Sequence, residues 1–137
     1  MEKTKLKQYI ECLEVWSETK GFTIIFSKDE DDSIDLESKL ICINNRKSLE
    51  HQFFTMLHEC GHILASNNDS FGIKKAIDKY PKNSKGYKSF TLADEIEAWK
   101  RGLTLCKRLN IEVDKKLWDK CFSEAIMKYM EWATRKD

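Results

Sequence analysis

The sequence predicts an α+β fold in which a small twisted β-sheet packs on helices. Two short runs of β-branched and aromatic residues in the first third of the chain indicate strands. Several longer segments repeat apolar residues at helical spacing, and one of them carries a His-Glu-x-x-His motif. A length of 137 residues suits one core, so residues 1–137 are expected to form a single domain.

The first third of the chain is expected to supply one helix and the sheet. Residues 4–20 have amphipathic spacing, and the pattern stops before Gly21. Residues 21–26 and 40–44 are short, aromatic or β-branched, which is typical of strands. The acidic run at residues 29–32 lacks the glycine and the terminal glutamate of an EF-hand, so we expect a solvated turn there instead of a calcium loop.

The most informative segment is His58-Glu59-Cys60-Gly61-His62, a complete HExxH motif. Ser48 can cap the start of a helix, and the polar run from Asn67 can end it. On this helix the apolar residues gather on one side, whereas both histidines fall on the opposite arc. Imidazoles four residues apart can bind one metal ion, and a neighbouring glutamate can accept a proton from water. The sequence therefore predicts His58 and His62 as metal ligands and Glu59 as a general base.

The second half of the chain begins with a polar stretch and continues with helices. Residues 67–90 contain six lysines, which favours a solvated connector, with a basic lid over the cleft as the alternative. A short helix can form around residues 72–80. A longer helix is expected from Thr91 to about Leu109, and Asp114 can cap a last one.

A catalytic zinc site normally has three protein ligands, so the two histidines need a third. His51 lies about 10 Å from His58 along the helix axis, which is too far to share the ion. Among the carboxylates of the helix at residues 91–109, the apolar stripe places Glu95 inward and Glu97 outward. A metal would remove the cost of burying Glu95, which is the predicted ligand; a lysine or arginine partner for it, or Glu97 as the ligand, are the alternatives. The stripe consists of Leu92, Ile96, Trp99, Gly102, Leu103, Cys106 and Leu109.

Residues 50–64, together with residues 94–99 (Asp-Glu-Ile-Glu-Ala-Trp), resemble the ImmA/IrrE-type metallopeptidases, whose small members occur in bacteria, phages and mobile elements. The order of the expected elements is also similar, so the resemblance covers most of the chain. It implies a zincin-like fold with an HExxH active-site helix and a following glutamate-bearing helix. It also implies that His58, His62 and Glu95 bind zinc and that Glu59 is the general base.

The chain departs from the better-known members of that family in two respects. Trp99 stands where they have a small polar residue, which leaves the choice between Glu95 and Glu97 less firmly determined. A helix-turn-helix module for DNA is also missing, so direct nucleic-acid binding is not expected.

The resemblance implies a zinc metalloendopeptidase that hydrolyses peptide bonds of a protein substrate, such as a repressor or another transcriptional regulator. Glu59 would accept a proton from water activated by Zn²⁺ and pass it to the leaving amine. Tyr129 and His51 are candidates for a second donor to the oxyanion. An extended substrate can add as a strand to an exposed edge of the sheet, for which residues 40–44 are the candidate. The alternatives are a zinc-containing module that sequesters a regulatory partner without cutting it and a metal-free regulatory protein.

Composition argues against several other classes of protein. The net charge is +1, with 24 basic and 23 acidic residues, so no strong global field attracts nucleic acid. No stretch reaches the length of a membrane span, and the N-terminus has no signal-peptide pattern. The five cysteines are scattered without a CxxC pair, so we expect reduced thiols, mostly in the core, in a cytoplasmic protein.

Overall fold

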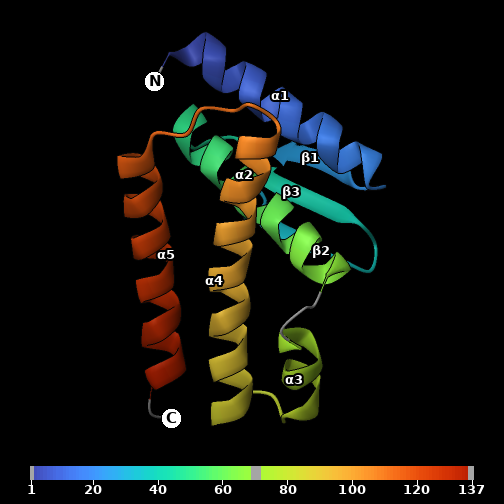
Figure 1. The fold of residues 1–137 in the computed structure, drawn as a ribbon, viewed down its shortest axis with the longest axis vertical. Helices are drawn as coiled ribbons and strands as arrows, with labels where there is room; N and C mark the ends of the chain where they lie inside the picture. Colours follow the sequence, from blue (N-terminus) through green and yellow to red (C-terminus); the bar gives the residue numbers. More distant parts are fainter. Residues whose placement is uncertain (1, 69–71, 136–137) are drawn as a thin grey trace.

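The computed structural model describes residues 2–68 and 72–135, and this part of the chain is α+β, as predicted (Figure 1). A three-stranded sheet and α1 lie at one end, and the long helices α4 and α5 run side by side away from it. The elements are, in order, α1 (Lys3–Thr19), β1 (Thr23–Ser27), β2 (Ser33–Asp35), β3 (Leu40–Asn44), α2 (Leu49–Asn67), α3 (Ile73–Lys79), α4 (Lys85–Arg108) and α5 (Lys115–Thr134). No helix in the described ranges is both long and apolar enough to cross a membrane.

The sheet has the order β1-β3-β2, with β3 parallel to β1 and antiparallel to β2. The expected strand at residues 40–44 is therefore central, and the prediction that a substrate adds there is wrong because both of its edges are already paired. β2 was not predicted. It has three residues, of which only Ile34 is apolar, so it gives too short an alternation to recognise. β2 is an edge strand of this sheet.

α2 is the central element of the core and contacts α1, β3 and α4. Its buried face meets fully buried side chains from each neighbour, including Leu13 of α1, Ile43 of β3 and Leu105 of α4. Behind the HExxH motif, the buried Cys60 Sγ lies 3.3 Å from Ser17 Oγ of α1. The motif helix is therefore fixed on one side by a continuous core, and its other side is left for the polar residues.

α4 begins at Lys85, six residues before the expected start at Thr91, with Ser84 accepting a hydrogen bond from the Tyr87 N–H as its N-cap. The predicted apolar stripe is also only partly right. Leu92 and Ile96 are half-buried, whereas Ala98 and Leu105, which the stripe omitted, are completely buried. α4 contacts both α2 and α5, so two of its faces are covered and a single stripe describes it incompletely.

α2 and α4 cross so closely that two glycines leave no space for a side chain. A Cβ atom on Gly61 would overlap the carbonyl oxygen of Ala98, and one on Gly102 would overlap the carbonyl oxygen of Leu57. Both obstacles are backbone atoms, which cannot rotate away as a side chain can. This crossing sets the distance between the HExxH motif and the side chains of α4.

We predict that Gly102→Ala destabilises the fold by about 1–3 kcal/mol, because the added methyl group pushes α4 away from the backbone of α2. Gly61→Ala should act in the same way. Chemical denaturation followed by circular dichroism measures the effect.

Lys100→Ala is the control, since Lys100 lies in the same helix and its side chain is exposed. Alanine favours a helix at least as well as lysine does, so the stability of this variant should stay within about 0.5 kcal/mol of the wild type. Equal stability of Gly102→Ala and the wild type would contradict the close crossing.

Candidate metal centre

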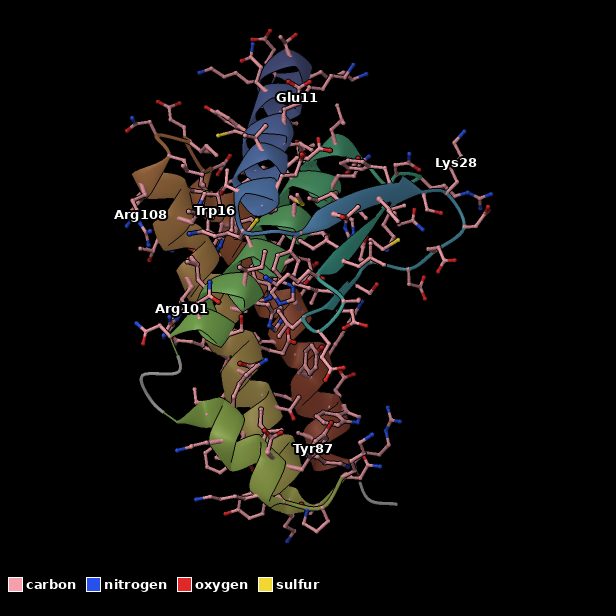
Figure 2. The ribbon with its side chains drawn as sticks, turned by 90° about the vertical axis from the view of Figure 1, so that its right-hand side faces the viewer. Glu11, Trp16, Lys28, Tyr87, Arg101 and Arg108 are labelled. Carbon is pink, nitrogen blue, oxygen red and sulfur yellow. The ribbon has the colours of Figure 1, made fainter. Side chains whose placement is uncertain are left out.

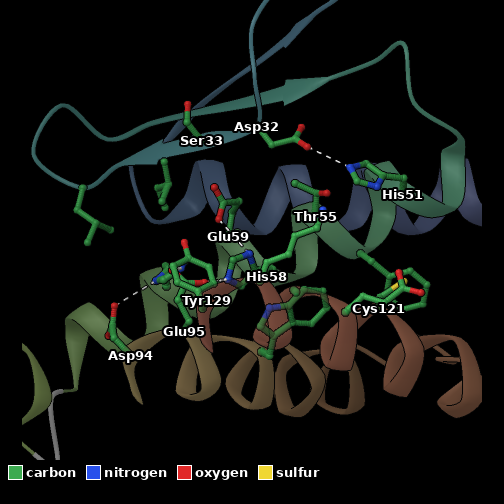
Figure 3. Close-up of a pocket in the computed structure, with 18 of the residues that line it drawn as sticks. Asp32, Ser33, His51, Thr55, His58, Glu59, Asp94, Glu95, Cys121 and Tyr129 are labelled. Atoms are coloured by element: carbon green, nitrogen blue, oxygen red, sulfur yellow. Dashed lines mark hydrogen bonds and ion pairs between the residues drawn. The ribbon is translucent and has the colours of Figure 1, made fainter. Parts of the chain in front are cut away.

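His58, His62 and Glu95 meet where α2 crosses α4 (Figure 3). Nε2 of His58 lies 2.7 Å from one carboxylate oxygen of Glu95, and Nε2 of His62 lies 3.1 Å from the other. One potential ligand atom from each residue lies within 4.8 Å of the other two. Two imidazole nitrogens and one carboxylate oxygen form a donor set typical of catalytic zinc. The structure thus brings together the three residues that the sequence suggested as ligands.

The charges of these residues are mutually dependent. Burial alone would raise the pKa of Glu95, but hydrogen bonds and positive charge from His58 and His62 hold it well below its usual range. Burial alone would lower the pKa of His62, but the hydrogen bond and negative charge of Glu95 raise it. Glu95 is therefore ionised, which is the state that a metal ligand requires. A cation would take the place of the shared protons, so these residues fit a metal ion.

Glu97 points away from this cluster. Its carboxylate accepts a hydrogen bond from Nε of Arg101, one turn further along α4, at 2.8 Å. The same guanidinium also donates to the carbonyl oxygen of Leu64 at 3.3 Å. Glu97 is thus paired with Arg101 and is not part of the cluster, although this pair is partly buried and contacts the end of α2 instead of lying on a solvated outer face.

Glu59 is buried beside the cluster, with one carboxylate oxygen 3.4 Å from Nδ1 of His58. Burial raises the pKa of Glu59, the two histidines oppose the rise, and the negative charges of Glu95 and Asp32 add to it. A carboxylate with a raised pKa is a stronger proton acceptor near neutral pH. Its position and environment suit a general base.

Two neighbours that the sequence analysis did not assign to the site hold the imidazole rings. The Trp99 ring stacks on His58, with centroids 4.9 Å apart and planes inclined by 17°. The carboxylate of Asp94 lies 3.6 Å from Nδ1 of His62. Contacts of this kind fix the orientation of a ligating histidine. In the sequence, the only indication of these roles is position, since Asp94 directly precedes Glu95 and Trp99 follows it by one helical turn.

A cleft of about 1010 Å³ opens above these side chains. β2 and the residues beside it form one wall, α5 forms the other, and the cluster on α2 and α4 lies between them (Figure 3). Among the residues that the structure describes, none of the six lysines at 67–90 lines this cleft, so the basic-lid alternative has no support here. The acidic run contributes Asp32, which was expected in a solvated turn.

The two candidate oxyanion donors lie in different places (Figure 3). Tyr129 projects from α5 into the cleft and lies beside Glu95. Burial raises the pKa of Tyr129, and the negative charge of Glu95 raises it further. His51 lies about two helical turns from His58, and its Nε2 is 3.1 Å from the carboxylate of Asp32. Of these two residues, Tyr129 is the one next to the candidate metal-binding cluster.

Comparison with known proteins adds one finding. A family model described as the IrrE N-terminal-like domain, of the M78 peptidases, matches residues 18–96. The matched segment runs from the end of α1 to just beyond Glu95 and thus contains the sheet, the HExxH helix and all three candidate ligands. Trp99 and α5 lie outside it. Neither the curated proteins nor the solved structures gave a significant match.

The two acidic residues of α4 provide a direct test of the cluster. Glu95→Ala should weaken zinc binding by at least about tenfold, because two imidazoles remain where a stable site needs three ligands. Glu97→Ala should change the affinity little, since that carboxylate pairs with Arg101.

Zinc titration against a competing chelator measures both affinities. Each change removes one negative charge from the same helix, so a general electrostatic effect would reduce both alike. Loss of zinc in Glu97→Ala together with retention in Glu95→Ala would overturn the assignment.

Proposed function

Because the chain belongs to the family of the IrrE N-terminal-like domain, a family of metallopeptidases, we propose that it is a zinc-dependent endopeptidase of a protein substrate. The observation that carries this proposal is the cluster of His58, His62 and Glu95 on the floor of an open cleft, with Glu59 beside it. The proposed substrate is a regulatory protein such as a repressor, in keeping with the ImmA/IrrE-type resemblance of the motif.

His58, His62 and Glu95 are the residues that would hold the zinc ion. When bound, zinc supplies Lewis-acid chemistry: it polarises a carbonyl group and lowers the pKa of water to about 7. Asp94 and Trp99 keep the two imidazoles in place, so that little rearrangement is needed for binding.

We propose that Glu59 transfers a proton from the attacking water to the leaving amine. As the water oxygen forms its bond to the scissile carbonyl carbon, the Glu59 carboxylate accepts the proton that the water loses. The π electrons of the carbonyl bond move to its oxygen. When the bond to nitrogen then breaks, Glu59 returns the proton to the leaving amine, which restores the carboxylate.

The free edge of β2 is the proposed guide for the substrate. β3 pairs with β2 on one side only, and β2 lines the cleft beside the cluster. A peptide in extended conformation can hydrogen-bond to such an edge along its backbone. Because a folded domain does not present a free extended segment, the cleavable site should lie in a linker or loop of the substrate.

Purified without chelators, the protein should contain about one zinc ion per chain. Free zinc at about 100 times its dissociation constant should stabilise the fold by about 3 kcal/mol relative to the metal-free protein, because the ion binds only the folded state. Elemental analysis and thermal unfolding measure these two quantities. Folded protein with no zinc, and no stabilisation on adding it, would refute the zinc site.

Glu59→Gln should keep its zinc and its fold but lose more than about 99% of peptidase activity, since an amide cannot accept the proton of water. Cleavage can be followed with a library of quenched fluorescent peptides and by mass spectrometry of proteins captured by this inactive variant. Wild-type rates in Glu59→Gln would rule out the mechanism.

A further inference from the structure

α5 lies outside the segment that the family model matches, yet it forms one wall of the cleft. We infer that Tyr129 of this helix is a catalytic residue whose hydroxyl donates a hydrogen bond to the oxygen that becomes negative on the scissile carbonyl. This inference rests on the proposed peptidase function. It adds a residue that the HExxH motif and its glutamate do not provide.

The position of the hydroxyl is the first support. Tyr129 lines the cleft beside the Glu95 carboxylate, at the level of the candidate metal ligands (Figure 3). Glu59 and Asp94 are also close enough to interact with it electrostatically. A substrate carbonyl that reaches Glu59 and the ligand cluster must therefore come close to the Tyr129 hydroxyl.

The second support is that Glu59 and Tyr129 can fill different chemical roles. Glu59 accepts the proton of water and later releases it to the amine, so it cannot also stabilise the negative oxygen. A phenol hydroxyl can donate a hydrogen bond to that oxygen and keep its own proton throughout. Among the two candidates that the sequence offered, His51 is held by Asp32 at a distance from the cluster.

Rigid support of the tyrosine is the third observation. The ring of Tyr129 packs edge-on against Trp132, with centroids 6.1 Å apart and planes at 89°. Lys88 of α4 donates from Nζ to the carbonyl oxygen of Trp132 at 3.3 Å, and its ammonium lies 5.5 Å from the centre of the Trp132 ring. Tyr87 also packs edge-on against Trp132, with centroids 6.3 Å apart and planes at 75°. We call Tyr87, Lys88 and Trp132 the Trp132 clamp.

The Trp132 clamp accounts for a lysine that is only 7% exposed. Through Tyr87 and Lys88, the first turns of α4 contact the end of α5. Figure 2 shows Tyr87 at the end of the molecule far from the sheet. The burial of Lys88 fixes the register of α5 along α4. Lys88 is thus a positioning residue for Tyr129, which lies one turn before the clamped carbonyl.

Tyr129→Phe is the decisive variant, because it removes the hydroxyl and keeps the ring that packs on Trp132. The peptidase should lose about 100-fold to 1,000-fold in kcat with KM nearly unchanged, as expected when an oxyanion donor is removed. Tyr9→Phe is the control. Tyr9 is also a partly buried tyrosine, but it packs on Phe53 of α2 and does not line the cleft.

A second readout does not require turnover. An alanine phosphinic pseudodipeptide, whose tetrahedral oxygens imitate the reacting carbonyl, should bind zinc-loaded Tyr129→Phe about tenfold or more weakly than the wild type. Zinc affinity itself should be unchanged. Equal binding of the pseudodipeptide and equal kcat in the two proteins would overturn the role of Tyr129. Failure of the zinc-loaded wild type to bind the pseudodipeptide or to cleave any peptide would instead refute the proposed function.

Lys88 can be tested through a double-mutant cycle. Lys88→Met should lower kcat in the wild type but cause no further loss in the Tyr129→Phe background, because the lysine acts through the hydroxyl. Lys88→Arg, which can still donate to the Trp132 carbonyl, should restore most of the rate. An equal loss in both backgrounds would show that Lys88 supports only the fold.

Discussion

The crossing of α2 and α4 leaves no space for a side chain at Gly61 or Gly102, and the candidate metal-binding cluster depends on this contact. A zinc ion requires ligand atoms a few ångströms apart, whereas packed helices are usually separated by 8–10 Å between their axes. Glutamate can bridge that gap only if the backbones approach closely. Glycine inside the HExxH motif and in α4 permits this approach, so a packing requirement and a chemical requirement are met at the same positions.

The sequence predicted the parts of the site that follow from helical periodicity. Four residues separate His58 and His62, and the apolar stripe of α4 placed Glu95 inward, which needs no knowledge of distant contacts. The start of α4 could not be predicted in this way. Lys88 is buried and contacts Trp132, which lies 44 residues later, whereas a lysine-rich segment otherwise indicates solvent. β2 was missed because three residues carry too little pattern, and its pairing with β3 is a tertiary contact.

Different segments of the chain supply the candidate ligands and the walls of the cleft. α2 and α4 contribute the candidate ligands and base, whereas β2 and α5 contribute the walls along which a substrate would lie. The family model ends just after Glu95, so the α5 wall belongs to the part of the chain beyond the matched segment. Changes in such walls can alter which molecule fits the cleft without altering the candidate ligands, which is how one fold can serve several functions.

The buried side of the HExxH helix carries a cysteine, Cys60. Cys60 stands directly after Glu59 but faces the core, and burial raises the pKa of its thiol to about 12. The Ser17 hydroxyl donates to the Leu13 carbonyl oxygen at 2.8 Å, which leaves its oxygen free to accept from this thiol. Only thiolates bind soft metals strongly or react quickly with peroxides and alkylating reagents. Cys60 thus lies close to the candidate metal centre, but as a buried thiol it is a poor metal ligand and a poor target for oxidants.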